Sequence, residues 1–309
     1  MIRLTKIREL DLADTGDATT PRHLSAASGL ACTGSFIYVV ADDELHLGVF
    51  SATDSTPGRL IRLFDGALPA TKAARKKQKP DLEAIVRLPS FGTYRNGALL
   101  ALGSGSERNR RRGALLQLDE DGATAGAPRV VDISRMFDHL AQHIPALNIE
   151  SAVVIGDKLR LLQRANKSHP QNAIVHYSLT AFLYALANDD SVGAIAPIAI
   201  DPIDLGHIDG VPLSFTDGAS LPDGRMVFTA VAEDTEDTYN DGACLGAAIG
   251  IVACNNEALS LEPIDECHKV EGVAARVDNN VISLVLVTDA DDSAMPAALF
   301  SARLPNMAF

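Results

Sequence analysis

Five short segments of the chain share one pattern, and four of them begin with a carboxylate. In each segment a small or acidic residue is followed by Gly, Ala or Ser and by apolar residues, and the segments start roughly 50 to 70 residues apart. The leading residues are Ser28, Glu83, Glu150, Asp217 and Glu271, with Ser220 as an alternative to Asp217. Oxygen ligands without His or Cys beside them favour Ca2+ over Zn2+, and Mg2+ suits them less well. If the five residues meet, the sequence predicts a calcium site.

The strands that follow these segments indicate how the leading residues come together. In four segments a turn signal such as Asp223-Gly224 comes about six residues after the leading residue, and a β-prone run follows it. Further β-prone runs complete each repeat, and four antiparallel strands repeated around an axis make a propeller blade. We therefore predict an all-β, single-domain, five-bladed β-propeller over residues 1–309. The predicted blades are approximately 28–66, 82–134, 149–204, 216–264 and 270–305.

The two ends of the sequence predict how the ring closes. The last repeat lacks a fourth strand, whereas residues 2–12 alternate like a strand but belong to no repeat. We expect this N-terminal strand to complete the last blade, which would remove the sheet edges of an open ring. Six blades are the alternative if the stretch 177–205 hides another blade, although 180–188 within it is predicted to be a helical insertion.

Blade topology places the five leading residues around a central channel, at the end where the long loops gather. Long loops at one end of a rigid scaffold are a common place for function. Four carboxylates among apolar neighbours require either steeply raised pKa values or a neutralising cation. The alternative is a water-filled channel in which these acids bind water and backbone groups.

Two loops at this end carry side chains suited to an anionic ligand. They belong to the second and third blades, and the residues concerned are Ser104, Ser106 and Arg108, then Arg164, Asn166 and Lys167. One guanidinium group can donate two parallel hydrogen bonds to the oxygens of a phosphate, and a nearby metal would neutralise the negative charge that develops during reaction. We therefore expect one basic pocket beside the cation, with Glu83, Glu150, Arg108 and Arg164 as catalytic candidates. The alternative is that these are solvated loop tips, which is also how we interpret the basic residues in 75–79.

Other polar residues form weaker patterns. Asp42 and Asp289 lie at matching strand ends and suggest a second calcium site or a site for a cationic group of the ligand, with plain surface acidity as the alternative. His139 and His143 have helical spacing but no third ligand, so a metal role is disfavoured. No GxSxG, Walker or dinucleotide-binding motif is present, so a serine-hydrolase mechanism has no support.

Four of the repeated segments resemble the five-bladed calcium-activated nucleotidases, or apyrases. These segments begin Ser28-Gly29-Leu30, Glu83-Ala84, Glu150-Ser151-Ala152 and Glu271-Gly272. They are also similar to bacterial phytase-like esterase propellers. The resemblance implies a central calcium and, for the apyrases, hydrolysis of nucleoside di- or triphosphates. It covers the repeat cores and little of the loops, and the fourth segment departs from it because Asp217 precedes Ala219-Ser220. Six-bladed sugar-lactone hydrolases are a lower-ranked alternative.

Composition narrows the partners and the compartment. The formal charge is −13, aromatic residues make up 5% and tryptophan is absent, which disfavours nucleic-acid and membrane partners. The N-terminus lacks the apolar segment of a signal peptide, so we expect a cytoplasmic protein unless a leader has been removed. The four cysteines are expected to be reduced, with a Cys244–Cys254 bridge left open.

The sequence thus leaves two functions. The first is a calcium-dependent hydrolase of a phosphorylated or otherwise anionic small molecule. The second is a noncatalytic propeller with structural calcium that binds a protein or small ligand on its loop face. Because propellers host both kinds of function, the fold does not choose between them.

Overall fold

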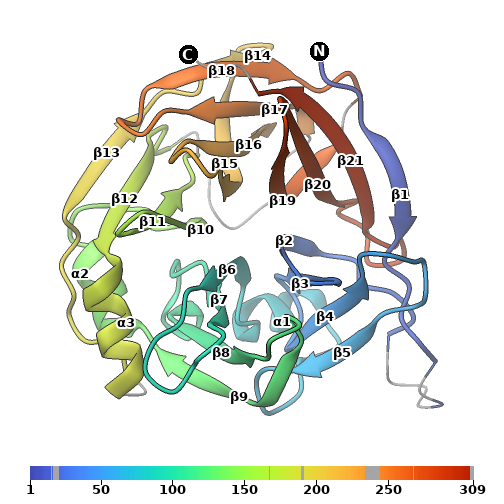
Figure 1. Cartoon of the computed structure of the whole chain (residues 1–309), viewed down its shortest axis with the longest axis vertical. Helices are drawn as coiled ribbons and strands as arrows, with labels where there is room; N and C mark the ends of the chain where they lie inside the picture. Colours follow the sequence, from blue (N-terminus) through green and yellow to red (C-terminus); the bar gives the residue numbers. More distant parts are fainter. Residues whose placement is uncertain are drawn as a thin grey trace.

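Five antiparallel sheets surround a common axis in the computed structural model, which describes residues 1–14, 16, 21–166, 168–188, 191–233, 244–266 and 268–306. Each sheet is one blade, and the blades follow one another around the ring in chain order (Figure 1). The innermost strands of the five blades contact one another in cyclic order, and the innermost strand of the fifth blade contacts that of the first. The predicted all-β, five-bladed propeller is confirmed.

In the first four blades the strands run outward from the axis in sequence order. The first blade consists of β2 (Ala27–Thr33), β3 (Phe36–Ala41), β4 (His46–Ser51) and β5 (Arg59–Arg62). The second consists of β6 (Leu82–Leu88), β7 (Ala98–Gly103), β8 (Arg112–Leu118) and β9 (Thr124–Asp132). The third consists of β10 (Ile149–Ile155), β11 (Lys158–Gln163), β12 (Asn172–Ser178) and β13 (Ala199–Ile203). The fourth blade consists of β15 (Val211–Ser220), β16 (Met226–Glu233), β17 (Cys244–Val252) and β18 (Ala258–Pro263), with the short β14 (His207–Ile208) paired to the start of β15.

The fifth blade joins the two ends of the chain. Its inner strands β19 (Lys269–Asp278), β20 (Val281–Asp289) and β21 (Ala298–Pro305) come from the C-terminal part, and β1 (Thr5–Glu9) supplies the outer strand. β1 pairs antiparallel with β21, from Thr5 opposite Ser301 to Glu9 opposite Ala298. The closing strand is therefore confirmed, and the ring needs no separate sixth sheet.

Apolar side chains between the blades form the core. Because a strand sends successive side chains to opposite faces, Leu161 of β11 packs with residues of blade 2 whereas Leu162 packs with residues of blade 4. The stretch that could have hidden a sixth blade contains α3 (Leu179–Asn188), as predicted, and α3 buries Phe182 and Leu186 in the core that blades 2 and 3 share.

The loop end of the ring carries the remaining helices. α1 (Lys72–Gln78) lies between blades 1 and 2, the 3-10 helix η1 (Arg108–Arg110) precedes β8, and α2 (Ser134–Leu140) connects blades 2 and 3. Among the described residues no helix is long and apolar enough to cross a membrane. No disulfide joins the described cysteines, so Cys244 and Cys254 are not bridged to each other, and Cys267 lies outside the described residues.

Candidate functional site

Every inner strand carries a β-bulge at the same place, and the bulges define the equivalent positions of the five blades. In each blade the register between the inner strand and its neighbour shifts across one residue. The residues at the shift are Ser28, Glu83, Glu150, Thr216 and Glu271. Bulges redirect side chains and often lie beside functional sites. Four of the five predicted leading residues therefore occupy equivalent positions, and the fourth blade differs from the prediction by one residue.

Asp217 lies one residue beyond the bulge, and its hydrogen bonds link three blades. Its Oδ1 accepts hydrogen bonds from the Ser151 hydroxyl at 2.5 Å and from its neighbour Gly218 N at 2.7 Å, and its Oδ2 accepts one from Val273 N at 2.7 Å. Burial raises the pKa of Asp217 to about 7. The alternative, Ser220, lies at the far end of β15 opposite Met226. The equivalent residue is Thr216, and the sequence pattern misses it because an acid stands directly after it.

The two bulge residues that carry a hydroxyl group donate hydrogen bonds to the next blade. Ser28 Oγ donates to the carbonyl of Leu82, and Thr216 Oγ1 donates to the carbonyl of Val270 at 2.7 Å. In both cases the acceptor is the residue directly before the next blade's bulge. Small residues follow some bulges because the blades approach closely there: a Cβ on Gly272 would lie 3.0 Å from Gly29 Cα. The small-residue position of the sequence pattern thus reflects blade packing.

Charged side chains from all five blades surround the axis at this end, and we call them the axial cluster. Among the described residues it contains eight carboxylates, Asp42, Asp81, Glu83, Glu150, Glu233, Glu271, Asp289 and Asp291, and four basic side chains, Lys79, Arg110, Arg164 and Lys269. If all are ionised, the cluster carries four more negative than positive charges. The fold therefore brings an excess of negative charge together, and every carboxylate of the cluster except Asp291 is buried or half-buried.

Two basic side chains pair with the carboxylates of blades 3 to 5. Arg164, in the loop after β11, places Nη1 3.2 Å from Glu150 Oε2 and Nη2 2.6 Å from Glu233 Oε2. Lys269 Nζ lies 2.7 Å from Asp291 Oδ1, 3.2 Å from Glu233 Oε1 and 3.4 Å from Glu271 Oε1. Glu150 and Glu271 were predicted as metal ligands, and in this half of the cluster protein cations already neutralise part of their charge.

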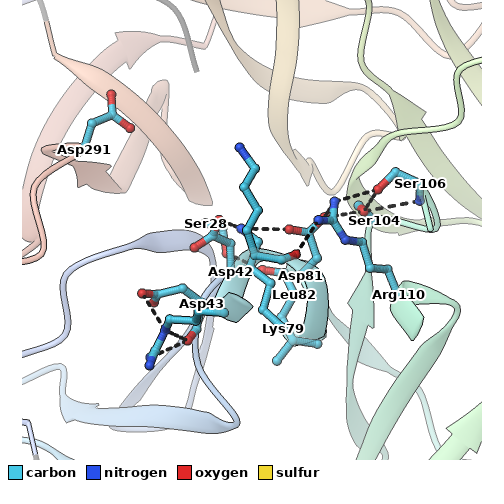
Figure 2. A network of polar contacts seen from close by, with 12 residues as sticks. Ser28, Asp42, Asp43, Lys79, Asp81, Leu82, Ser104, Ser106, Arg110 and Asp291 are labelled. Atoms are coloured by element: carbon cyan, nitrogen blue, oxygen red, sulfur yellow. Dashed lines mark hydrogen bonds and ion pairs between the residues drawn. The ribbon is translucent and has the colours of Figure 1, made fainter. Parts of the chain in front are cut away.

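The half formed by blades 1 and 2 is organised around Asp81. Its Oδ1 is 2.9 Å from Lys79 Nζ, and its Oδ2 is 2.7 Å from Arg110 Nη1 and 2.5 Å from the Ser104 hydroxyl (Figure 2). Lys79 Nζ also contacts Asp42. The interpretation of Lys79 as part of a solvated loop is wrong. α1 ends directly before Lys79, and the side chain of Lys79 points inward, so that only 8% of the residue is exposed.

Three carboxylates in this half form the best candidate for a cation site. One oxygen each from Asp42, Asp81 and Glu83 lies within 4.8 Å of the others. Asp42 follows β3, Asp81 precedes β6 and Glu83 is the bulge residue of β6. Among the described residues Glu83 has no hydrogen-bond or ion-pair partner. Asp81 was not found from the sequence because it stands outside the repeated pattern.

Burial dominates the electrostatics of the axial cluster. It raises the pKa of Glu83 well above its ordinary value, and repulsion from Glu150, Asp81 and Asp42 adds to this effect. Burial also raises the pKa of Glu150 to about 7, and that of Glu271 to about 8. The pKa of Asp289 rises to about 8 for the same reason. These carboxyl groups either hold protons near neutral pH or need additional positive charge.

The predicted anion-binding residues are distributed differently from the expected basic pocket. Arg108 is exposed on η1, whereas Arg164 is enclosed by the glutamates at the axis. Ser104 and Ser106 bind Asp81 and Arg110.

The other residues of these loops serve local structure. Asn166 closes a turn by accepting a hydrogen bond from His169 N at 2.8 Å, and Lys167 lies outside the described residues. Arg111 pairs with Asp138, and Arg112 lies over the Phe64 ring. His139 and His143 have ring centroids 5.6 Å apart at α2.

Comparison with known proteins places the chain in a family. The model of a family of unknown function, DUF6929, matches residues 23–304. The chain belongs to the DUF6929 family. The match runs from before β2 into β21, so the complete axial cluster falls inside the DUF6929 region. No curated protein sequence matches the chain.

Solved structures similar to this DUF6929 protein are propellers at low sequence identity. The α-L-arabinofuranosidase of Podospora anserina is 12% identical with a TM-score of 0.50, and the match covers 99% of this chain and 98% of that one. The glutaminyl cyclase of Myxococcus xanthus is 10% identical with a TM-score of 0.48, covering 98% and 97%. The α-L-arabinanase of Penicillium chrysogenum is 10% identical with a TM-score of 0.44, covering 98% and 99%. At these identities the likeness shows the fold alone.

Proposed function

We propose that this DUF6929 protein is a calcium-binding β-propeller whose cation is held by Asp42, Asp81 and Glu83. The observation that carries the proposal is the convergence of three carboxylate oxygens within 4.8 Å of one another. Calcium binds oxygens at 2.3–2.6 Å, so oxygens on opposite sides of one ion are separated by up to about 5 Å. The three carboxylates are therefore spaced as ligands of one cation would be.

The chemistry of the donors supports calcium over other metals. The three side chains offer only hard oxygen atoms, with no His or Cys among them. A divalent cation would also reduce the excess negative charge of the axial cluster and provide a partner for Glu83. Of the five metal ligands predicted from the sequence, this ligand set retains only Glu83. It adds Asp42, which was expected to bind a second calcium ion or a cationic group of the ligand, and Asp81.

A calcium titration of melting temperature tests the site. Because a ligand that binds only the folded state stabilises it by mass action, calcium at 100 times its dissociation constant should add about 2.7 kcal/mol to the unfolding free energy. We expect chelator-stripped protein to melt about 5 °C higher when saturated with calcium. Magnesium should have a smaller effect.

The variant Glu83→Gln should abolish this rise. Without calcium, Glu83→Gln should melt at or above the wild type, because the substitution removes a carboxylate whose burial and repulsive neighbours raise its pKa. Glu107→Gln, which changes an exposed acid at the same end, is the matched control and should keep the full calcium response. A wild type without calcium-dependent melting, and without calcium on metal analysis, would contradict the proposal.

The orientation of Glu150 favours hydrolysis of an anionic small molecule as a second candidate function. Glu150 lies close enough to Glu83 for the two to repel each other, and Asn148 and Arg164 each bind one of its oxygens. A bound calcium ion would polarise a phosphoryl group of the substrate. Glu150 could then orient a water molecule toward phosphorus and accept its proton while the bond to the leaving oxygen breaks.

Phosphate release from nucleoside di- and triphosphates and from sugar phosphates measures this activity. If the protein is a hydrolase, Glu150→Gln should reduce turnover by about 100-fold or more while the calcium-dependent rise in melting temperature remains. Calcium binding without phosphate release from any of these substrates would leave the noncatalytic propeller, in which calcium is structural and the loop end binds a ligand.

A further inference from the structure

Lys79 and the proposed calcium ion need the same two carboxylates. Lys79 Nζ lies 2.9 Å from Asp81 Oδ1 and also contacts Asp42. Both residues belong to the candidate cation site. We propose that Lys79 is an exchangeable internal counter-ion: calcium displaces its ammonium group from Asp42 and Asp81, and Lys79 thereby sets the calcium affinity of the site. This inference rests on the proposed function, because it describes how that site is regulated.

The surroundings of Lys79 allow the side chain to leave while its backbone stays in place. Its backbone N–H donates to the carbonyl of Arg75 at 2.8 Å, and its carbonyl accepts a hydrogen bond from Asn109 Nδ2 at 2.9 Å. Pro80 follows directly, which restricts the chain further. Four rotatable bonds separate this fixed backbone from the ammonium group. Rotations within the side chain are therefore sufficient for the exchange.

Electrostatics favours the exchange once calcium is available. An ammonium group supplies one positive charge and satisfies Asp42 and Asp81, while Glu83 has no hydrogen-bond or ion-pair partner among the described residues. A calcium ion supplies two charges and can bind oxygens of all three carboxylates at once. Because the ammonium and the calcium ion would repel each other at this separation, the two occupants exclude one another. The freed ammonium group would move outward at the end of α1, toward solvent.

Lys269 provides an internal contrast. It is equally buried, with 9% of the residue exposed, but its partners are Glu233, Glu271 and Asp291 in the other half of the axial cluster. None of these is a ligand in the proposed site. Calcium should therefore release Lys79 and leave Lys269 in place.

Lysine footprinting with an amine-acetylating reagent and mass spectrometry tests the exchange on the unmodified chain. In chelated protein Lys79 should be protected, and saturation with calcium should raise its acetylation rate by about tenfold or more. Lys77, which is exposed on α1, should react equally in both states, and Lys269 should stay protected in both. Protection of Lys79 that persists at saturating calcium would overturn the inference.

Calorimetric calcium titration of Lys79→Met gives an independent measurement. Without the competing ammonium group the variant should bind calcium about tenfold more tightly than the wild type, whereas Lys77→Met should bind like the wild type. A wild type that binds calcium while Lys79→Met binds it no more tightly would overturn the exchange and leave the calcium site intact. If neither protein binds calcium, both the site and the exchange are refuted. The footprinting result decides the question if Lys79→Met does not fold.

Discussion

Replacing Arg164 with Met should lower the free energy of unfolding by about 3–5 kcal/mol at pH 7.5. Arg164 contacts Glu150 and Glu233, and both glutamates are buried, with 3% and 8% of the residue exposed. The substitution keeps most of the side-chain volume but leaves two enclosed carboxylates with less positive charge. Because whole domains are stable by only about 5–15 kcal/mol, this loss should be obvious in urea denaturation.

The deficit of Arg164→Met should depend on pH in a defined direction. Burial already raises the pKa of Glu150 to about 7, above its ordinary value, and losing the guanidinium group would raise it further. A carboxyl group whose pKa is higher in the folded state contributes stability below its unfolded pKa and loses this contribution as pH rises through the folded pKa. The difference between wild type and variant should therefore be smaller near pH 5 than at pH 8.

Two further variants separate charge from packing in this experiment. Arg108→Met removes an exposed guanidinium group at the same end and should cost at most about 0.5 kcal/mol. Adding Glu150→Gln to Arg164→Met should restore part of the stability, because one buried carboxylate disappears with its partner. A deficit that stays constant from pH 5 to 8 would mean that Arg164 acts through packing and not through its charge.

The sequence predicted the architecture well because the architecture repeats. Turn signals and β-prone runs recur in each blade, so a weak signal in one repeat is supported by the other four. The closing strand could be predicted for the same reason, since the last repeat lacked one strand and residues 2–12 had no partner. The bulge carboxylates Glu83, Glu150 and Glu271 were found because they occupy the same place in each repeat.

The candidate site was predicted only in part because its other members do not repeat. Lys79 and Asp81 come from the connection between blades 1 and 2, and Lys269 stands at the very start of β19. Residue type does not distinguish Lys79 from the exposed Lys77 of α1, because the burial of Lys79 depends on where the helix ends. Thr216 was missed because a neighbouring acid fitted the pattern better, and only the register of β15 and β16 distinguishes them.

These omissions changed the expected chemistry of the axis. A ring of carboxylates without nearby cations requires a metal, whereas four basic side chains within the ring remove much of that need. In blades 3 to 5 the carboxylates face Arg164 and Lys269, but near blades 1 and 2 Glu83 has no hydrogen-bond or ion-pair partner among the described residues. This asymmetry is why we propose the cation beside blades 1 and 2 and not at the centre of five equivalent ligands.

Asp81→Asn should be the most damaging single substitution in this half of the axial cluster, with a loss of about 3 kcal/mol in the unfolding free energy of chelated protein. Asp81 is only 4% exposed and, in the part of the chain that the structure describes, contacts both Lys79 and Arg110. Its neutral replacement would leave two buried cations with too little negative charge nearby. Calcium should not restore the lost stability, because the same substitution removes a proposed ligand.

Asp138→Asn is the matched control for this experiment, because Asp138 also pairs with an arginine, Arg111, but its side chain is 55% exposed. An exposed ion pair is worth about 0–1 kcal/mol, so this control should melt close to the wild type. Adding Lys79→Met to Asp81→Asn should recover part of the loss by removing one of the uncompensated cations. If Asp81→Asn lowers the unfolding free energy no more than Asp138→Asn does, then Asp81 does not stabilise Lys79 and Arg110 when the protein is in solution. If calcium still raises its melting temperature fully, Asp81 is not a ligand, and the proposed three-carboxylate site is refuted.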